Sequence, residues 1–228
     1  MILTPEQAYS VLLNLQEPER TLTLLASGTG LRISECLGLQ WQDVSFVDAI
    51  IHVRRTWTCG QVGLPKSKAS KGPVPLHPLL AEFILRWQQS TSYSQPADWV
   101  FPSIRLQGKQ PRVANMLVED HLRPAAVKAG ILSSHRDTRG RLVDDDPRRF
   151  GFHNLRHSLP SFLIGIKTDP KTVQTLLRHS DVKLTLQFYT HAVSRDRMAA
   201  AGKMLTAILS HAADQSGLKA DCGATAPS

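Results

Sequence analysis

One stretch of the chain, residues 41–76, departs from the helical pattern of the sequence around it. Its β-forming side chains are Ile50, Ile51, Val53, Trp57, Val62 and Val74. Glycine and proline residues interrupt this run, which is typical of short strands joined by turns. The stretch therefore predicts a small antiparallel β-sheet inside a chain that is otherwise mainly α, an α+β fold class.

Helical signals flank this stretch on both sides. "TPEQ" begins a helix, because Thr4 can cap it, Pro5 suits its first position and Gln7 can complete a capping box. A second helix follows Pro18 and stops at residues 28–30. A short helix begins near Arg32. Later helices are predicted at residues 77–89, 114–129, 150–163, 168–180, 180–191 and 195–212.

Two polar segments lie outside these helices. Residues 133–149 are dense in charge, which predicts an exposed and partly disordered loop. Residues 213–228 predict a disordered tail. Because the sequence shows neither an internal repeat nor a linker, we expect residues 1–212 to form one domain.

The chain is strongly basic: its 228 residues carry a formal net charge of +8, and the sequence pI is about 9.7. Such a balance favours a polyanionic partner such as nucleic acid. No apolar run is long enough to cross a membrane, and the first residues lack the features of a signal peptide, so we expect a cytoplasmic protein without a membrane partner. Cys36, Cys59 and Cys222 are too widely spaced to suggest disulfides or a zinc site.

The chain also carries cationic, imidazole and phenol side chains that could form a site. They are Arg32, Lys66 or Lys68, His153, Arg156, His179 and Tyr189. Two of them, His153 and Arg156, share one helical turn with His157 at i, i+3, i+4 spacing. Each residue alone has an ordinary explanation, such as an ion pair between Arg32 and Glu35 or a solvated lysine. Only the joint pattern carries an argument.

That joint pattern resembles a known family. "SGTGLRISECLGLQWQDV", "HNLRHS" and "LLRHSDVKLTLQFYTH" are similar, in this order, to the motif boxes of the tyrosine recombinases, the phage-integrase family. The resemblance runs from residue 3 to about residue 192 and keeps the order Arg, Lys, His-x-x-Arg, His, Tyr. It implies the fold of a tyrosine recombinase catalytic domain, and a site-specific recombinase or integrase that breaks and rejoins double-stranded DNA.

The resemblance implies a role for each residue of the set. Arg32 and Arg156 would hold the oxygens of the scissile phosphate, because guanidinium groups stay charged and donate paired hydrogen bonds. Tyr189 would attack phosphorus and form a 3′-phosphotyrosine bond. Lys66, with Lys68 as the alternative, would protonate the leaving 5′ oxygen.

The histidines and the acidic residue would assist. His153 and His179 would donate to phosphate oxygens or relay a proton. Glu35 would orient Arg32, and His157 would support the neighbouring active-site groups. The resemblance implies no metal, ATP or other cofactor, because the phosphotyrosine bond preserves the energy of the broken phosphodiester.

Several features differ from the family's usual pattern. Arg178 stands where glycine commonly precedes the third-box histidine, in a left-handed turn that costs an arginine about 1 kcal/mol. Pro160 removes a backbone hydrogen bond about one turn after Arg156 and is expected to bend the helix. The N-terminal core-binding domain that grips DNA is absent from this sequence, so we expect weak and steeply salt-dependent DNA binding.

The resemblance further implies a homo-oligomer, a tetramer on paired DNA sites, in the bacterial cytoplasm and associated with the nucleoid. Two other functions stay open from the sequence. One is a DNA-binding remnant of a mobile element that has the same fold but cannot cleave. The other is a metalloprotein that uses the histidines His153, His157, His179 and His191.

Overall fold

The computed structural model describes residues 1–67, 69–140 and 142–178. Outside these residues lie the expectations for Lys68, His179, Tyr189, His191 and Cys222, for the helices at 180–191 and 195–212, and for the tail at 213–228.

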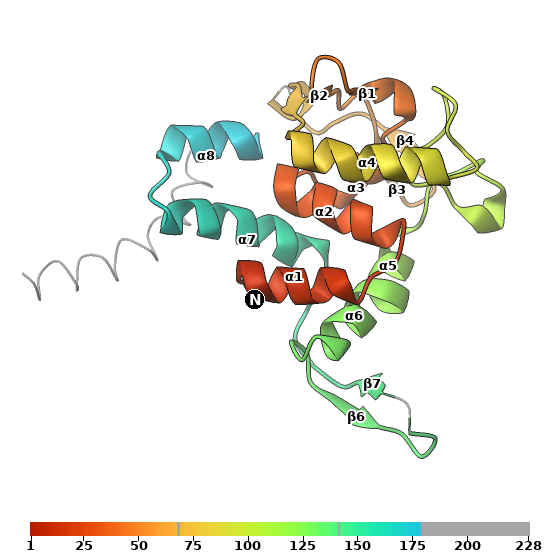
Figure 1. Cartoon of the computed structure of the whole chain (residues 1–228), viewed down its shortest axis with the longest axis vertical. Helices are drawn as coiled ribbons and strands as arrows, with labels where there is room; N and C mark the ends of the chain where they lie inside the picture. Colours follow the sequence, from red (N-terminus) through yellow and green to blue (C-terminus); the bar gives the residue numbers. More distant parts are fainter. Residues whose placement is uncertain (68, 141, 179–228) are drawn as a thin grey trace, which may run out of the picture.

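The described chain is mainly helical, as the sequence predicts. Its helical elements are α1 (Pro5–Leu13), α2 (Glu19–Thr29), α3 (Ile33–Leu37), η1 (Trp41–Asp43), η2 (Ala69–Lys71), α4 (Pro78–Ser90), η3 (Ile104–Leu106), α5 (Ala114–Leu117), η4 (Val118–Leu122), α6 (Arg123–Lys128), α7 (Phe152–Gly165) and α8 (Pro170–Leu177). Helix α2 packs against both α4 and α7, and α8 packs on α7 (Figure 1). The ends of α2, α7 and α8 are thereby brought to one region of the molecule.

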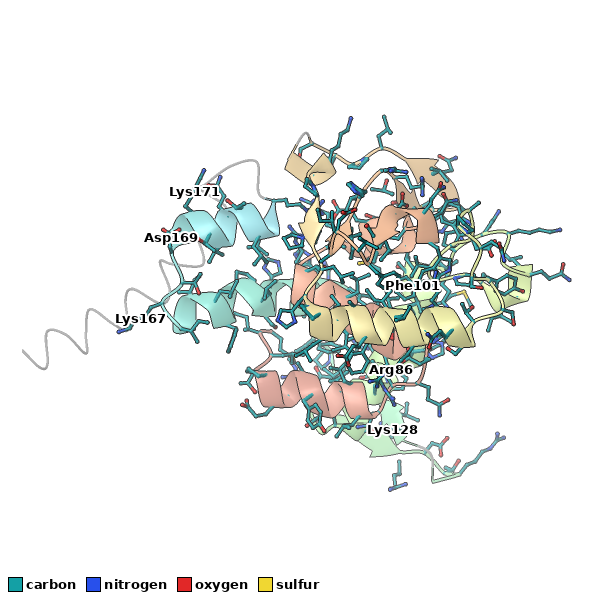
Figure 2. The ribbon with its side chains drawn as sticks, turned by 45° about the horizontal axis from the view of Figure 1, so that its top comes forward. Arg86, Phe101, Lys128, Lys167, Asp169 and Lys171 are labelled. Atoms are coloured by element: carbon teal, nitrogen blue, oxygen red, sulfur yellow. The ribbon has the colours of Figure 1, made fainter. Side chains whose placement is uncertain are left out.

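Local signals determine where these helices begin and end. The Thr4 hydroxyl accepts a hydrogen bond from the Gln7 amide at 3.3 Å, and the Gln7 side chain accepts one from the Thr4 amide at 3.0 Å. The capping box predicted for α1 is therefore confirmed. Asp169 caps α8 by accepting from the Thr172 amide at 2.8 Å (Figure 2). Helix α2 ends at Gly30, whose φ of +64° is a left-handed conformation that glycine adopts without strain.

The β-rich stretch forms two small antiparallel sheets. Strands β1 (Val44–Ser45), β2 (Ile50–Ile51) and β5 (Val74–Pro75) pair in the order β1-β2-β5, while β3 (Thr56–Thr58) and β4 (Gln61–Gly63) form a separate hairpin. The predicted antiparallel pairing is confirmed, although it is divided between two sheets. The β3–β4 hairpin packs against α3, the short helix that follows Arg32.

Residues 133–149 are largely exposed, as predicted, but in place of a partly disordered loop this segment contains a third hairpin. Strand β6 (Ser134–Arg136) pairs antiparallel with β7 (Leu142–Asp144), and the hairpin extends away from the body of the protein (Figure 1). Its base is fixed by Arg123 of α6, which forms an ion pair with Asp144 and donates to the Asp146 carbonyl at 2.9 Å.

Buried apolar residues from nearly every element form one core. Among its fully buried members are Leu22 and Leu25 of α2, Ile51 of β2, Ile84 of α4, and Phe101 (Figure 2). Helix α7 runs without interruption through Pro160, which is buried. In the part of the chain that the structure describes, no helix is both long and apolar enough to cross a membrane.

Candidate active site

Arg32 stands at the junction of α2 and α3. The chain leaves α2 through the left-handed Gly30, and Arg32 is the extended residue immediately before α3. Its guanidinium Nη1 donates to Glu35 Oε1 at 3.1 Å and to the Ser70 hydroxyl at 3.2 Å, and its backbone amide donates to Glu35 Oε2 at 2.9 Å. The Arg32 side chain nevertheless keeps 39% of its surface exposed, so it can contact a ligand from solvent.

Arg156 lies on the buried side of α7 and joins the ends of two other helices. Its Nη1 donates to the carbonyl of Gly30 at the end of α2, and its Nη2 donates to the carbonyl of Leu177 at the end of α8 at 2.9 Å. These carbonyls lie at helix C-termini, where the negative end of the helix dipole favours a cation. The residue is only 7% exposed.

The two arginines lie close enough to influence each other electrostatically. Burial, followed by the positive charge of Arg32, lowers the pKa of Arg156 to about 10. Arg156 therefore remains protonated at neutral pH but is held in an unfavourable place for a cation. A bound anion would relieve this repulsion, because it would pair with both guanidinium groups.

Glu35 is the acidic centre of the site and binds two arginines at once. It is 1% exposed, and its Oε2 accepts from Arg178 Nη2 at 2.7 Å while Oε1 accepts from Arg32. Arg178 is itself 8% exposed and donates through Nη1 to the Ser70 carbonyl at 2.6 Å. Buried charges require such partners, since an unpaired ion in the interior is costly.

Arg178 adopts the backbone conformation for which a glycine would be suited. Its φ is +53°, which places it in the left-handed region as the C-cap of α8. The strain of about 1 kcal/mol that this conformation imposes on an arginine is offset by the ion pair with Glu35. The sequence showed Arg178 as a departure from the family pattern, and gave no signal that its side chain reaches Glu35.

His153 and His157 form a pair on the first turns of α7. Their Nε2 atoms form a hydrogen bond, and the rings meet edge to face with centroids 4.0 Å apart and an interplanar angle of 81°. Burial, followed by the positive charges of Arg156 and Arg32, lowers the pKa of His153 below 6.5. Burial and the neighbouring His153 and Arg156 do the same for the pKa of His157. Both imidazoles are therefore neutral at pH 7. They line a pocket of about 600 Å³ together with Arg149.

Lys66 lies on the loop between β4 and η2, and its side chain is exposed. The same loop carries Ser70, which is fully buried and contacts both Arg32 and Arg178. The hydroxyls of Ser67 and Ser70 are 3.0 Å apart. Ser70 thus ties the loop that bears Lys66 to the arginine cluster.

The structure therefore brings together Arg32, Glu35 and Arg156, and it places His153 near both arginines. Lys68, His179 and Tyr189 lie outside the described residues, and His179 directly follows Arg178 in the chain. The residue that the sequence did not identify as part of the site is Arg178. Within the described residues, no group of three or more histidine, cysteine or acidic side chains could hold a metal ion.

Comparison of sequences supports a family assignment. Residues 2–195 match the phage integrase family. The chain is 30% identical over 210 residues to an integrase/recombinase of Escherichia coli, which covers 85% of this chain and 60% of that protein. It is also 30% identical over 172 residues to the tyrosine recombinase XerD of Proteus mirabilis, covering 72% of this chain and 44% of that protein. The chain thus spans about half of the length of these relatives.

Comparison of structures supports the same fold. The integrase of the transposon Tn1549, solved in complex with a circular intermediate DNA, superposes with a TM-score of 0.64 at 21% identity, covering 87% of this chain and 66% of the other. The XerA recombinase superposes with a TM-score of 0.61 at 20% identity, covering 88% of this chain and 63% of the other.

Proposed function

Because the chain belongs to the phage integrase family, we propose that it acts as the catalytic domain of a site-specific tyrosine recombinase that cuts and rejoins double-stranded DNA. The observation that carries the proposal is the convergence of Arg32 and Arg156, which come from distant parts of the chain and lie beside one buried carboxylate. The net charge of +8 supports a polyanionic substrate.

The arginines supply what phosphoryl transfer requires. The transition state carries extra negative charge on the non-bridging oxygens, and fixed donors aimed at that charge are typically worth about 10²–10³ in rate each. A guanidinium has five N–H donors. Arg156 uses one on Gly30 and one on Leu177, so it retains donors for a phosphate while its position is fixed by the other two bonds.

In the proposed reaction, the Tyr189 hydroxyl gives its proton to a neutral imidazole, that of His153 or His179, and attacks the phosphorus atom. A bond forms between the tyrosine oxygen and phosphorus, and the bond from phosphorus to the 5′ oxygen breaks. The DNA strand is then held as a 3′-phosphotyrosine, and the 5′ oxygen takes a proton from Lys66, or from Lys68 in its place. Attack by a 5′ hydroxyl on the phosphotyrosine reverses these changes and rejoins the strand.

The histidines and Glu35 assist this reaction. A neutral His153 can accept a proton or donate one hydrogen bond to a phosphate oxygen, and His179 would have the same two capacities. His157 fixes the ring of His153 through their shared hydrogen bond. Glu35 holds Arg32. The reaction exchanges one phosphodiester for another, so it requires neither ATP nor a metal ion to activate water.

The proposal extends to partners and location. Full recombination exchanges strands between two DNA sites, so we propose a homotetramer on paired sites. The similar lambda integrase has been solved as a dimer bound to DNA, which supports assembly on DNA. With chromosomal or mobile-element DNA as its substrate, the protein would act at the nucleoid in the bacterial cytoplasm.

A nicked suicide substrate tests the proposal, because the cleaved fragment diffuses away and traps the covalent complex. The native chain should give a DNA-linked band on a denaturing gel. Tyr189→Phe should give none while it binds the same duplex with near-native affinity. A band that persists in Tyr189→Phe would remove Tyr189 as the nucleophile. If a properly folded native chain binds DNA but gives no band with nicked duplexes that carry recombination sites of this family, that result would instead support a binding function without cleavage.

A further inference from the structure

Arg178 connects three segments that the proposed reaction needs. Its guanidinium donates to Glu35, which holds Arg32 at the start of α3. It also donates to the carbonyl of Ser70, on the loop that carries Lys66. Its own backbone closes α8 and leads directly to His179. No other described side chain contacts both Glu35 and this loop, apart from Arg32 itself.

The charges of this cluster show what Arg178 adds. Glu35 is fully buried between Arg32 and Arg178, and each arginine binds a different carboxylate oxygen with its guanidinium. Without Arg178, the Glu35 carboxylate would be hydrogen-bonded to the guanidinium of Arg32 alone. Glu35 would then hold that guanidinium more firmly and weaken its attraction for a phosphate. With Arg178 in place, the single carboxylate of Glu35 is paired with two guanidinium groups, so this cluster has a net positive charge.

We propose that Arg178 is a positioning residue for DNA strand cleavage, which shares Glu35 with Arg32 and fixes the Lys66 loop against the end of α8. The inference rests on the proposed cleavage function. Both terminal nitrogens of the Arg178 guanidinium donate to protein acceptors, Glu35 and the Ser70 carbonyl, so its proposed effect on cleavage is exerted through Arg32 and the loop.

The backbone of Arg178 makes a sharp test possible. In Arg178→Gly the left-handed conformation becomes unstrained, so the turn itself should form at least as well as before. The same substitution removes the guanidinium and leaves space beside Glu35 Oε2 and the Ser70 carbonyl. Lys167 provides the matched control, because it has the same conformation with φ of +61° but an exposed side chain at the end of α7 (Figure 2).

The experiment measures covalent complex formation on the nicked suicide substrate, together with DNA affinity over a range of salt concentrations. Arg178→Gly should reduce the single-turnover rate by about 10-fold to 100-fold, the range typical when a residue that orients a reacting group is lost. Its DNA affinity and salt slope should match those of the native chain. Lys167→Gly should cleave at the native rate.

Chemical rescue separates positioning from a folding effect. Methylguanidinium added to Arg178→Gly should restore cleavage in a saturable manner and should not accelerate Lys167→Gly. Arg178→Lys should recover only part of the rate, because an ammonium cannot reproduce the two-sided contact of a planar guanidinium.

Three outcomes would overturn the inference. They are a native rate in Arg178→Gly, a reduced rate that methylguanidinium does not restore, and a loss of rate matched by an equal loss of DNA affinity. A native chain that forms no covalent complex would overturn the proposed function as well. A native chain that cleaves, with an unrescued Arg178→Gly, would overturn only this inference.

Discussion

Replacing Arg156 by methionine should abolish cleavage while it leaves the fold nearly as stable as before. Methionine fills much of the same space without the charge. The pKa of Arg156 is lowered from the ordinary value of an arginine to about 10, so the charged guanidinium is disfavoured in the folded chain by about 3 kcal/mol. Its removal therefore relieves a cost of that order.

The opposing cost comes from the two carbonyls that Arg156 binds, those of Gly30 and Leu177. Each buried acceptor left without a donor costs about 1–3 kcal/mol. The two effects offset each other, so we expect the free energy of unfolding to change by no more than about 2 kcal/mol, or about 1 M in the urea midpoint. The cleavage rate should fall by at least about 10²–10³, because a donor to the transition state is lost.

Urea unfolding followed by circular dichroism, and single-turnover cleavage of the suicide substrate, measure the two quantities. Arg123→Met is the control. The pKa of Arg123 is raised because its side chain hydrogen-bonds Asp144, so folding favours its charge, and its loss should destabilise the protein without impairing cleavage. A loss of about 4 kcal/mol or more in Arg156→Met, the size expected for breaking a buried ion pair, would show that the guanidinium is chiefly structural. Cleavage within about threefold of the native rate would refute its catalytic role.

Three further predictions follow from the geometry of the site. Folding lowers the pKa values of His153 and His157 below 6.5, so the free energy of unfolding should fall as the pH drops from about 6.5 through the pKa values of the folded protein. The difference between the urea midpoints at neutral and low pH should be smaller in the double variant His153→Gln/His157→Gln than in the native chain. An equal difference in the two proteins would contradict this. Gly30→Ala places a Cβ 2.9 Å from Leu177 Cδ2 in a backbone with φ of +64°. The control Gly140→Ala has a similar φ of +73°, but its Cβ meets nothing within 4 Å. Gly30→Ala should therefore lower both the free energy of unfolding and the cleavage rate more than Gly140→Ala does. Dialysis against EDTA should leave the cleavage rate unchanged; a loss that added Mg²⁺ or Zn²⁺ restores would show that the reaction needs a metal.

The features that the sequence predicted well are those set by neighbouring residues. The cap at Thr4 and the end of the second helix at Gly30 depend on residues within about four positions, so local chemistry determines them. The convergence of Arg32 and Arg156 depends on packing of α2 against α7. That arrangement was available from the sequence only through the resemblance to a family.

Long-range polar contacts were not predictable. Arg178 and Glu35 are separated by 143 positions, and nothing near either residue indicates the other. The hairpin at residues 134–144 was missed for a different reason. Its strands have three residues each, which is too short to show the alternation that identifies a strand. Its base is fixed by the ion pair of Asp144 with the distant Arg123.

This hairpin has a consequence for how the molecule could be divided. Arg32 and Glu35 precede it in the chain, whereas Arg156 and Arg178 follow it, and residues 138–140 at its tip are exposed. A two-stranded hairpin contributes little to stability by itself, so a break at the tip would spare the interior. The protein could then be supplied as two separate polypeptides, each holding half of the phosphate-binding cations and each inert alone. Mixing the two polypeptides would let α2 of one pack against α7 of the other and rebuild the arginine cluster. Strand cleavage would then start only when both polypeptides are present.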